Sequence, residues 1–139
     1  MKQLVRKRAR IVRVRHVQHL QASAQAAQAE GRVATLEANA ERLAMLRGSL
    51  TPEPGTLFAA TLSNAGELAM RLDAARDGMT PAIRDARASA ERLGMARMEA
   101  RIRQESAERL GERAQAAYAD WRERKLATPH RRRGGGGEE

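Results

Sequence analysis

The sequence predicts an all-α protein that folds as a long two-helix antiparallel coiled-coil hairpin. The 139 residues include 28 alanines, and most of the others are strong helix formers such as Arg, Glu, Leu and Gln. Only three residues are aromatic, which is too few to supply a large globular core. The second half of the chain repeats apolar residues at alternating steps of four and three, a pattern typical of a coiled-coil seam.

The first helix is expected from Lys2 to Arg47. Gly48 follows as a C-terminal stop, and the segment 48–55 contains two prolines and two glycines, which cannot continue a helix. We therefore expect a turn at 48–55, with the chain reversing near residue 53. Near this turn, the first helix shows the seam spacing at Val33, Leu36, Ala40, Leu43 and Leu50.

The second helix is expected over residues 56–126. Fifteen of its twenty seam positions, which start at Phe58 and end at Lys125, are apolar. Thr80 and Pro81 interrupt this helix, since Pro81 lacks a backbone donor. The seam spacing passes through unshifted, so a kink near Pro81 in one continuous helix is favoured over a third helix.

Residues 1–126 thus form the predicted hairpin, and residues 127–139 are expected to form a disordered basic and glycine-rich tail. A reversal at residue 53 would place residue 2 beside about residue 104. The second helix would then extend beyond the first by roughly 30 Å at 1.5 Å per residue. Tyr118 and Trp121 lie in this predicted overhang, where they would be free to bind another protein.

Several function classes find no support in the sequence. The chain has no cysteine, and His16 and His19 share a helix face without a neighbouring carboxylate, so no metal site is expected. No phosphate-binding loop or nucleophile motif occurs, and we expect neither catalysis, nor a cofactor, nor a small-molecule substrate. No segment is long and apolar enough to act as a signal peptide or a membrane span.

The net charge of +9 is unevenly distributed. Residues 1–29 hold seven Lys or Arg and no acid, whereas residues 41–77 hold four Arg against five acids. We expect a basic pole at Lys2, Arg6, Lys7, Arg8, Arg10 and Arg13. A basic helical protein that binds nucleic acid or an anionic surface is therefore the alternative to a protein-binding function, although no aromatic residues for base stacking lie within this run.

Four features occur together within residues 1–126: the start Met1-Lys2-Gln3-Leu4-Val5-Arg6, the turn near residue 50, the motif Phe58-x3-Leu62-x2-Ala65 and the ending 114–125. In these features the chain resembles the flagellar export protein FliJ family and its type III secretion counterparts. Three features depart from the family: Pro81 interrupts an arm expected to be continuous, the turn is short, and the family's aromatics on the first-helix face are absent.

The resemblance implies a cytoplasmic, non-enzymatic component of bacterial flagellum biogenesis and motility. It would bind the hexameric flagellum-specific export ATPase and the cytosolic domain of the membrane export gate, with export chaperones as further partners. It would reach the inner face of the membrane only through these partners. The implied gate contacts are Leu43, Leu46, Leu50, Phe58, Leu62 and Ala65. The implied ATPase contacts are Leu110, Ala114, Tyr118 and Trp121.

Overall fold

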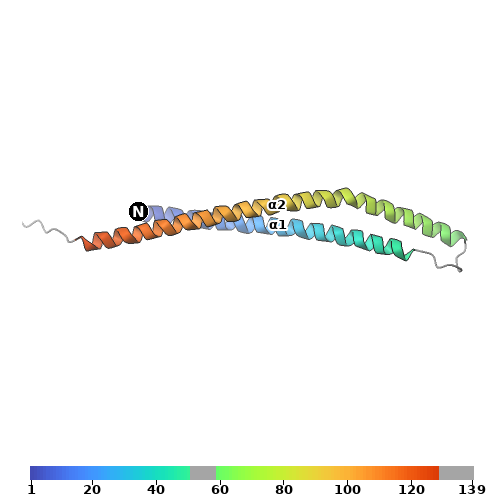
Figure 1. Cartoon of the computed structure of the whole chain (residues 1–139), viewed down its shortest axis with the longest axis horizontal. Helices are drawn as coiled ribbons and strands as arrows, with labels where there is room; N and C mark the ends of the chain where they lie inside the picture. Colours follow the sequence, from blue (N-terminus) through green and yellow to red (C-terminus); the bar gives the residue numbers. More distant parts are fainter. Residues whose placement is uncertain (51–58, 129–139) are drawn as a thin grey trace, which may run out of the picture. The chain divides into compact units, whose positions relative to one another are not determined.

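The computed structural model describes residues 1–50 and 59–128, and nearly all of them are helical. Helix α1 spans Lys2–Ser49 and helix α2 spans Ala59–Ala127 (Figure 1). No strand occurs in these two described ranges. The prediction of an all-α chain with two long helices is therefore confirmed.

The helix ends differ by a few residues from the sequence expectation. Helix α1 continues through Gly48 to Ser49, because the Ser49 hydroxyl donates to the Leu46 carbonyl and supports the last turn. Helix α2 continues to Ala127, and both the backbone N–H and the hydroxyl of Thr128 donate to the Arg124 carbonyl. The rest of the predicted tail and most of the predicted turn lie outside the described residues.

Helix α2 passes through Pro81 without a break. Proline removes one backbone hydrogen bond and its ring presses on the preceding turn, so a bend is the expected response. The yellow-green part of α2, which contains this position, changes direction in Figure 1. One continuous helix, and not a third helix after Pro81, is therefore what the structure shows.

The chain divides into two compact units, each containing a stretch of both helices. Unit 1 consists of Met1–His19 and Ala100–Glu139, and unit 2 consists of Leu20–Glu99. In unit 1, the side chains of His16 and Gln104 lie 3.3 Å apart, with Gln104 Nε2 near the His16 ring nitrogen Nδ1. In unit 2, Arg47 pairs with Asp73 at 3.2 Å, and Arg87 pairs with Glu37.

Each stretch of helix buries a narrow stripe of side chains. In unit 2, the buried or half-buried residues of α1 with seam spacing are Ala22, Ala26, Ala29, Val33, Leu36, Ala40, Leu43 and Arg47, and Leu50, just after the end of α1, continues this spacing. In α2 of unit 2 they are Ala65, Ala69, Leu72, Met79, Ile83, Ala86, Ala90 and Leu93. In unit 1 they are Val5, Arg8, Val12, Arg15 and His19 on α1, and Ala100, Gln104, Ala107, Gly111, Ala114 and Tyr118 on α2.

The most buried side chains on these stripes are alanines. Ala26, Ala69 and Ala86 in unit 2 and Ala107 in unit 1 are each at most 9% exposed. Methyl groups let two helix backbones approach closely, but each one buries little apolar surface. Stability in such a structure comes from many small contacts along the helices, because no large side chain is fully buried in the described part of the chain.

Candidate interaction surfaces

Unit 1 carries the net positive charge of the protein. Its described residues, 1–19 and 100–128, include 14 Lys or Arg and 5 Asp or Glu, a difference of +9. The described residues of unit 2, 20–50 and 59–99, include 9 of each and are neutral. The two units therefore differ sharply in the kind of partner that they attract over a distance.

A basic face on α1 of unit 1 is formed by Arg6, Lys7, Arg10 and Arg13. These four residues and Ala9 line a shallow hollow, and all of them are exposed. Their spacing of three and four residues gathers the charges on one side of the helix. None of the four forms an ion pair within the described residues. This basic face is therefore available to an anionic group from another molecule.

The predicted basic pole divides between two sides of α1. Lys2 is exposed, but Arg8 is half-buried and shares the packing stripe with Val5 and Val12. The aliphatic part of an arginine can cover apolar surface while its guanidinium reaches water. Arg8 thus contributes to packing within unit 1, which the sequence reasoning missed because it treated all six cations as one cluster.

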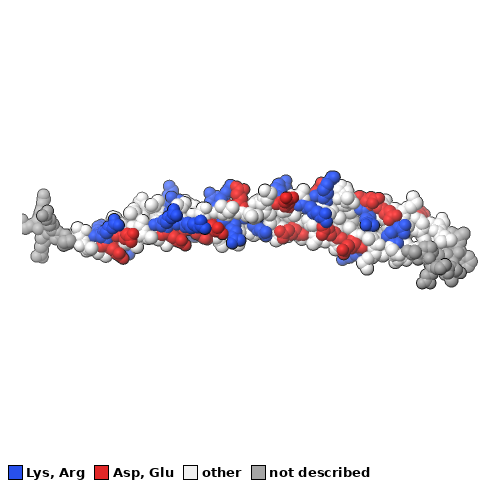
Figure 2. Space-filling view, viewed as in Figure 1, with Lys and Arg blue, Asp and Glu red and all other residues white. Residues whose placement is uncertain are grey.

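Figure 2 shows how the charged side chains are distributed along the described helices. On the face in view, Lys and Arg side chains lie interspersed with Asp and Glu along the described helices. Several of these neighbours pair within one helix, such as Arg71 with Glu67 and Arg101 with Glu105. Exposed pairs of this kind contribute only about 0.3–0.5 kcal/mol each. The basic face differs from this mixed surface because it gathers four cations on one side of α1 with no acidic residue among its lining residues.

A second feature of unit 1 is an aromatic cluster near the end of α2. The rings of Tyr118 and Trp121 stack with centroids 5.9 Å apart, and the Lys125 ammonium lies 5.0 Å from the centre of the Trp121 ring. Tyr118 is half-buried, but Trp121 remains 41% exposed. Stacking and the cation–π contact favour this orientation of the indole and leave part of its surface open.

The overhang predicted to begin near residue 104 is wrong. The Gln104 side chain meets His16, and a Cβ on Gly111 would lie 3.5 Å from Cγ2 of Val12. A groove in unit 1 is lined by both helices, with Val5, Ala9 and Val12 on one side and Glu108, Gly111 and Gln115 on the other. The α2 residues up to about 115 therefore have α1 neighbours.

The register of the helices explains this error. The prediction placed the reversal at the centre of the proline and glycine segment, as though the two helices paired symmetrically about it. In unit 2, however, Arg47, close to the end of α1, pairs with Asp73, well after the start of α2. Packing of the apolar stripes sets the register of the two helices. In this register, residues 61–64 at the start of α2 are exposed.

The implied gate contacts occupy two kinds of position. Leu43, Leu50 and Ala65 are half-buried, whereas Leu46 and Leu62 are 54% and 46% exposed. Phe58 lies outside the described residues. The accessible members of this set are therefore Leu46 near the end of α1 and Leu62 near the start of α2, both in unit 2.

The implied ATPase contacts all lie on α2 of unit 1. Leu110 is 41% exposed, whereas Ala114 is half-buried on the same stripe as Gly111. Trp121 and Leu110 are the more accessible members of this set.

Within residues 1–50 and 59–128, no three His, Asp or Glu side chains gather in a way that could hold a metal ion. None of the described helices combines the length and apolarity that crossing a membrane requires. No protein-family model, curated protein or solved structure matches the chain.

Proposed function

We propose that this protein is a non-enzymatic coiled-coil component of flagellar or related type III protein export. It binds the hexameric export ATPase and the cytosolic domain of the membrane export gate, and thereby couples the two. The support is the resemblance of residues 1–126 to the FliJ family together with the charge difference between the units. The charge difference, +9 against 0, is the observation that carries the proposal furthest.

The fold within this proposal is an antiparallel coiled-coil hairpin. In unit 2, Arg47 of α1 pairs with Asp73 of α2, and Glu37, which comes earlier in α1, pairs with Arg87, which comes later in α2. In unit 1, His16 of α1 lies beside Gln104 of α2, and the earlier residue Val12 lies beside the later residue Gly111. Residue numbers that rise along α2 while those of their α1 partners fall support the proposal of antiparallel helices in each unit. The seven-residue repeat of buried positions supports the proposal of a coiled coil.

The ATPase binds unit 1 in this account. The basic face attracts an acidic surface and speeds association, while the exposed part of Trp121 supplies an apolar anchor of the kind that dominates many interfaces. The gate binds at Leu46 and Leu62 in unit 2, together with Phe58. The protein acts in the cytoplasm and reaches the inner face of the membrane through the gate.

A calorimetric titration with the purified export ATPase of the same organism tests the proposal. The variant Arg6, Lys7, Arg10 and Arg13→Gln should bind at least about tenfold more weakly, since it loses four unpaired charges. A matched control replaces Arg71, Arg76, Arg84 and Arg92 of unit 2 by Gln and changes the net charge equally. The control should lose less than about twofold. Equal losses in both variants, or no binding by the wild type, would contradict the proposal.

The basic face also supports a second candidate, binding to nucleic acid or another anionic surface. Four exposed cations without ion pairs can neutralise about four phosphates, which predicts a salt dependence with a slope of roughly −3.6 on a double logarithmic plot. A fluorescence titration with duplex DNA across salt concentrations measures this slope. Tight DNA binding by a chain that does not bind the ATPase would favour the second candidate over the first.

A further inference from the structure

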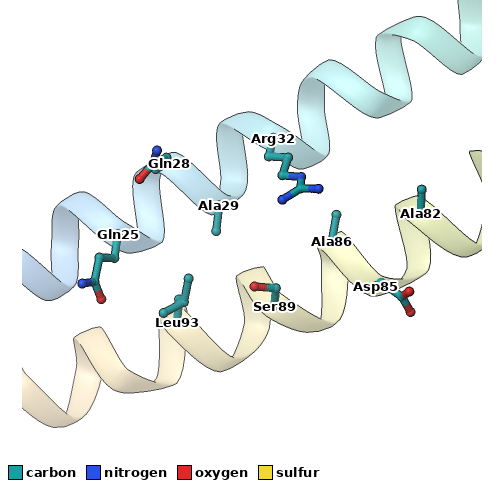
Figure 3. A pocket seen from close by; sticks show the side chains of 9 residues that line it. All are labelled: Gln25, Gln28, Ala29, Arg32, Ala82, Asp85, Ala86, Ser89 and Leu93. Atoms are coloured by element: carbon teal, nitrogen blue, oxygen red, sulfur yellow. The ribbon is translucent and has the colours of Figure 1, made fainter.

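A groove lies between α1 and α2 within unit 2. It has a volume of about 640 Å³ and is open to solvent along one side of the helix pair. Its lining residues are Gln25, Gln28, Ala29 and Arg32 of α1, and Ala82, Asp85, Ala86, Ser89 and Leu93 of α2. In Figure 3, Ala29, Ala86 and Leu93 point into the space between the helices, whereas Gln28 and Asp85 point away from it.

The groove is hollow because the facing side chains are small. Ala29 and Ala86 end in methyl groups, and Pro81 bends α2 just before Ala82. On another side of the pair, Arg87 and Glu37 form an ion pair between the same two helices. The grooved side therefore lacks a bridging charge pair, and covering the half-buried Ala29 and Leu93 on either side of the buried Ala86 would remove apolar surface from water.

The two rims of the groove carry opposite charges. Arg32 on the α1 rim forms no ion pair within the described residues. Asp85 on the α2 rim has only Arg84 as an ionic neighbour, at 3.5 Å, and both side chains are about three-quarters exposed. An exposed pair of this kind is weak, so Asp85 can turn to another cation at little loss.

A surface with one cation and one anion on opposite rims is complementary to itself. In a two-fold interface every contact occurs twice, so Arg32 of each copy can meet Asp85 of the other. The neutrality of unit 2 permits such an approach, since its described residues hold 9 basic and 9 acidic side chains. Unit 1, with its excess of cations, would instead repel a second copy.

We propose that the groove in unit 2 is a self-association surface on which a second copy of this chain docks. Two grooved sides face each other, so that the half-buried Ala29 and Leu93 of the two copies cover one another. Two Arg32–Asp85 pairs, one at each rim, fix the orientation of the copies. This inference does not depend on the export function.

Sedimentation equilibrium of the full chain, from micromolar to near-millimolar concentration, tests the proposal. The wild type should populate a dimer. Arg32→Asp and Asp85→Arg should each weaken dimerisation at least about tenfold, because each places like charges at both rims. The control Asp77→Arg makes the same charge change as Asp85→Arg on an exposed part of α2 outside the groove, and it should dimerise like the wild type.

Mixing the two charge variants separates contacts between chains from contacts within one chain. In a mixed dimer, the aspartate introduced by Arg32→Asp in one copy meets the arginine introduced by Asp85→Arg in the other. At the second rim, the unchanged Asp85 of the first copy meets the unchanged Arg32 of the second. An equimolar mixture should therefore recover dimers that neither variant forms alone. A contact within one chain would not be restored by mixing.

A further variant, Ala82→Arg, places a bulky cation at an exposed position of the groove and should abolish the dimer while helicity by circular dichroism is unchanged. A wild type that stays monomeric throughout, a mixture that stays monomeric, or a dimer that tolerates Ala82→Arg would each overturn the proposal. Those results would assign the groove to a different protein's helix, or to solvent alone.

Discussion

Replacing Ala26 by Leu tests directly how closely the helices pack in unit 2. Ala26 has no exposed surface, and it is the only fully covered side chain among those that form the described core. Leucine adds three carbon atoms at a position without free space, so side chains or backbones must shift. Overpacking of this kind typically destabilises by about 1–3 kcal/mol.

The sign of the effect makes this test decisive. If space existed at Ala26, the added carbons would stabilise the protein by up to about 0.8 kcal/mol per buried methylene. Chemical denaturation monitored by circular dichroism at 222 nm measures the free energy of unfolding. We expect a loss of about 2 kcal/mol, which lowers the thermal midpoint by roughly 5 °C or more.

Two matched variants isolate the packing effect. Ala27→Leu makes the same change at an exposed neighbour and should alter stability by less than about 0.5 kcal/mol, since Ala and Leu have similar helix propensities. Ala29→Leu places the same atoms in the groove and should be neutral or stabilising. If the Ala26→Leu protein were as stable as the Ala27→Leu protein, close packing of the helices at Ala26 would be refuted.

Three further predictions address the partner surfaces and the bend. Trp121→Ala should change unfolding little, because Trp121 is 41% exposed, but it should weaken ATPase binding by about 2 kcal/mol, roughly thirtyfold, by calorimetry. Adding Tyr118→Ala should also lower the free energy of unfolding, because Tyr118 is half-buried on the stripe of unit 1. A large shift in unfolding for Trp121→Ala without a loss of binding would make Trp121 structural. Leu62→Ala, alone or with Phe58→Ala, should weaken binding to the purified gate domain and leave helicity intact; unchanged gate affinity would exclude this contact. Pro81→Ala should raise the free energy of unfolding by about 1 kcal/mol or more, because it restores a backbone donor within α2; a less stable variant would show that the bend itself is required.

The seam of α2 was predictable from the sequence because its apolar residues are frequent and regularly spaced. Of the predicted positions from Ala65 to Tyr118, only Arg76 and Arg97 are exposed in the structure. An arginine at a seam position can extend its charged end into water, so a single polar residue does not disturb the repeat. The continuity of α2 through Pro81 followed from the same unshifted spacing.

The seam of α1 was only partly predictable. Arg8, Arg15 and His19 occupy its half-buried positions in unit 1, and polar residues at such positions hide the repeat from a search for apolar spacing alone. The complementary seam of α2 was the signal that could have revealed it, because each stripe requires a partner of equal length.

The register between the helices was not predictable from the turn. Loop composition shows where a helix must stop, but packing of the two stripes decides which residues become neighbours. The misplaced overhang at residue 104 follows from this difference. The groove in unit 2 was also not predicted. A groove depends on the distance between two helices, and the spacing of apolar residues along one helix does not indicate that distance.

The most direct test of the account uses the absence of cysteine from the chain. Val12→Cys with Gly111→Cys places two thiols at positions where Val12 Cγ2 lies 3.5 Å from a Cβ on Gly111. The proposed antiparallel hairpin predicts rapid formation of an intramolecular disulfide in dilute, mildly oxidising solution, visible as a faster-migrating monomer on a non-reducing gel. Val12→Cys with Gln104→Cys, two turns away, should not close. A disulfide in the control pair but not in the first, or only crosslinks between chains, would contradict the hairpin on which the proposed function rests.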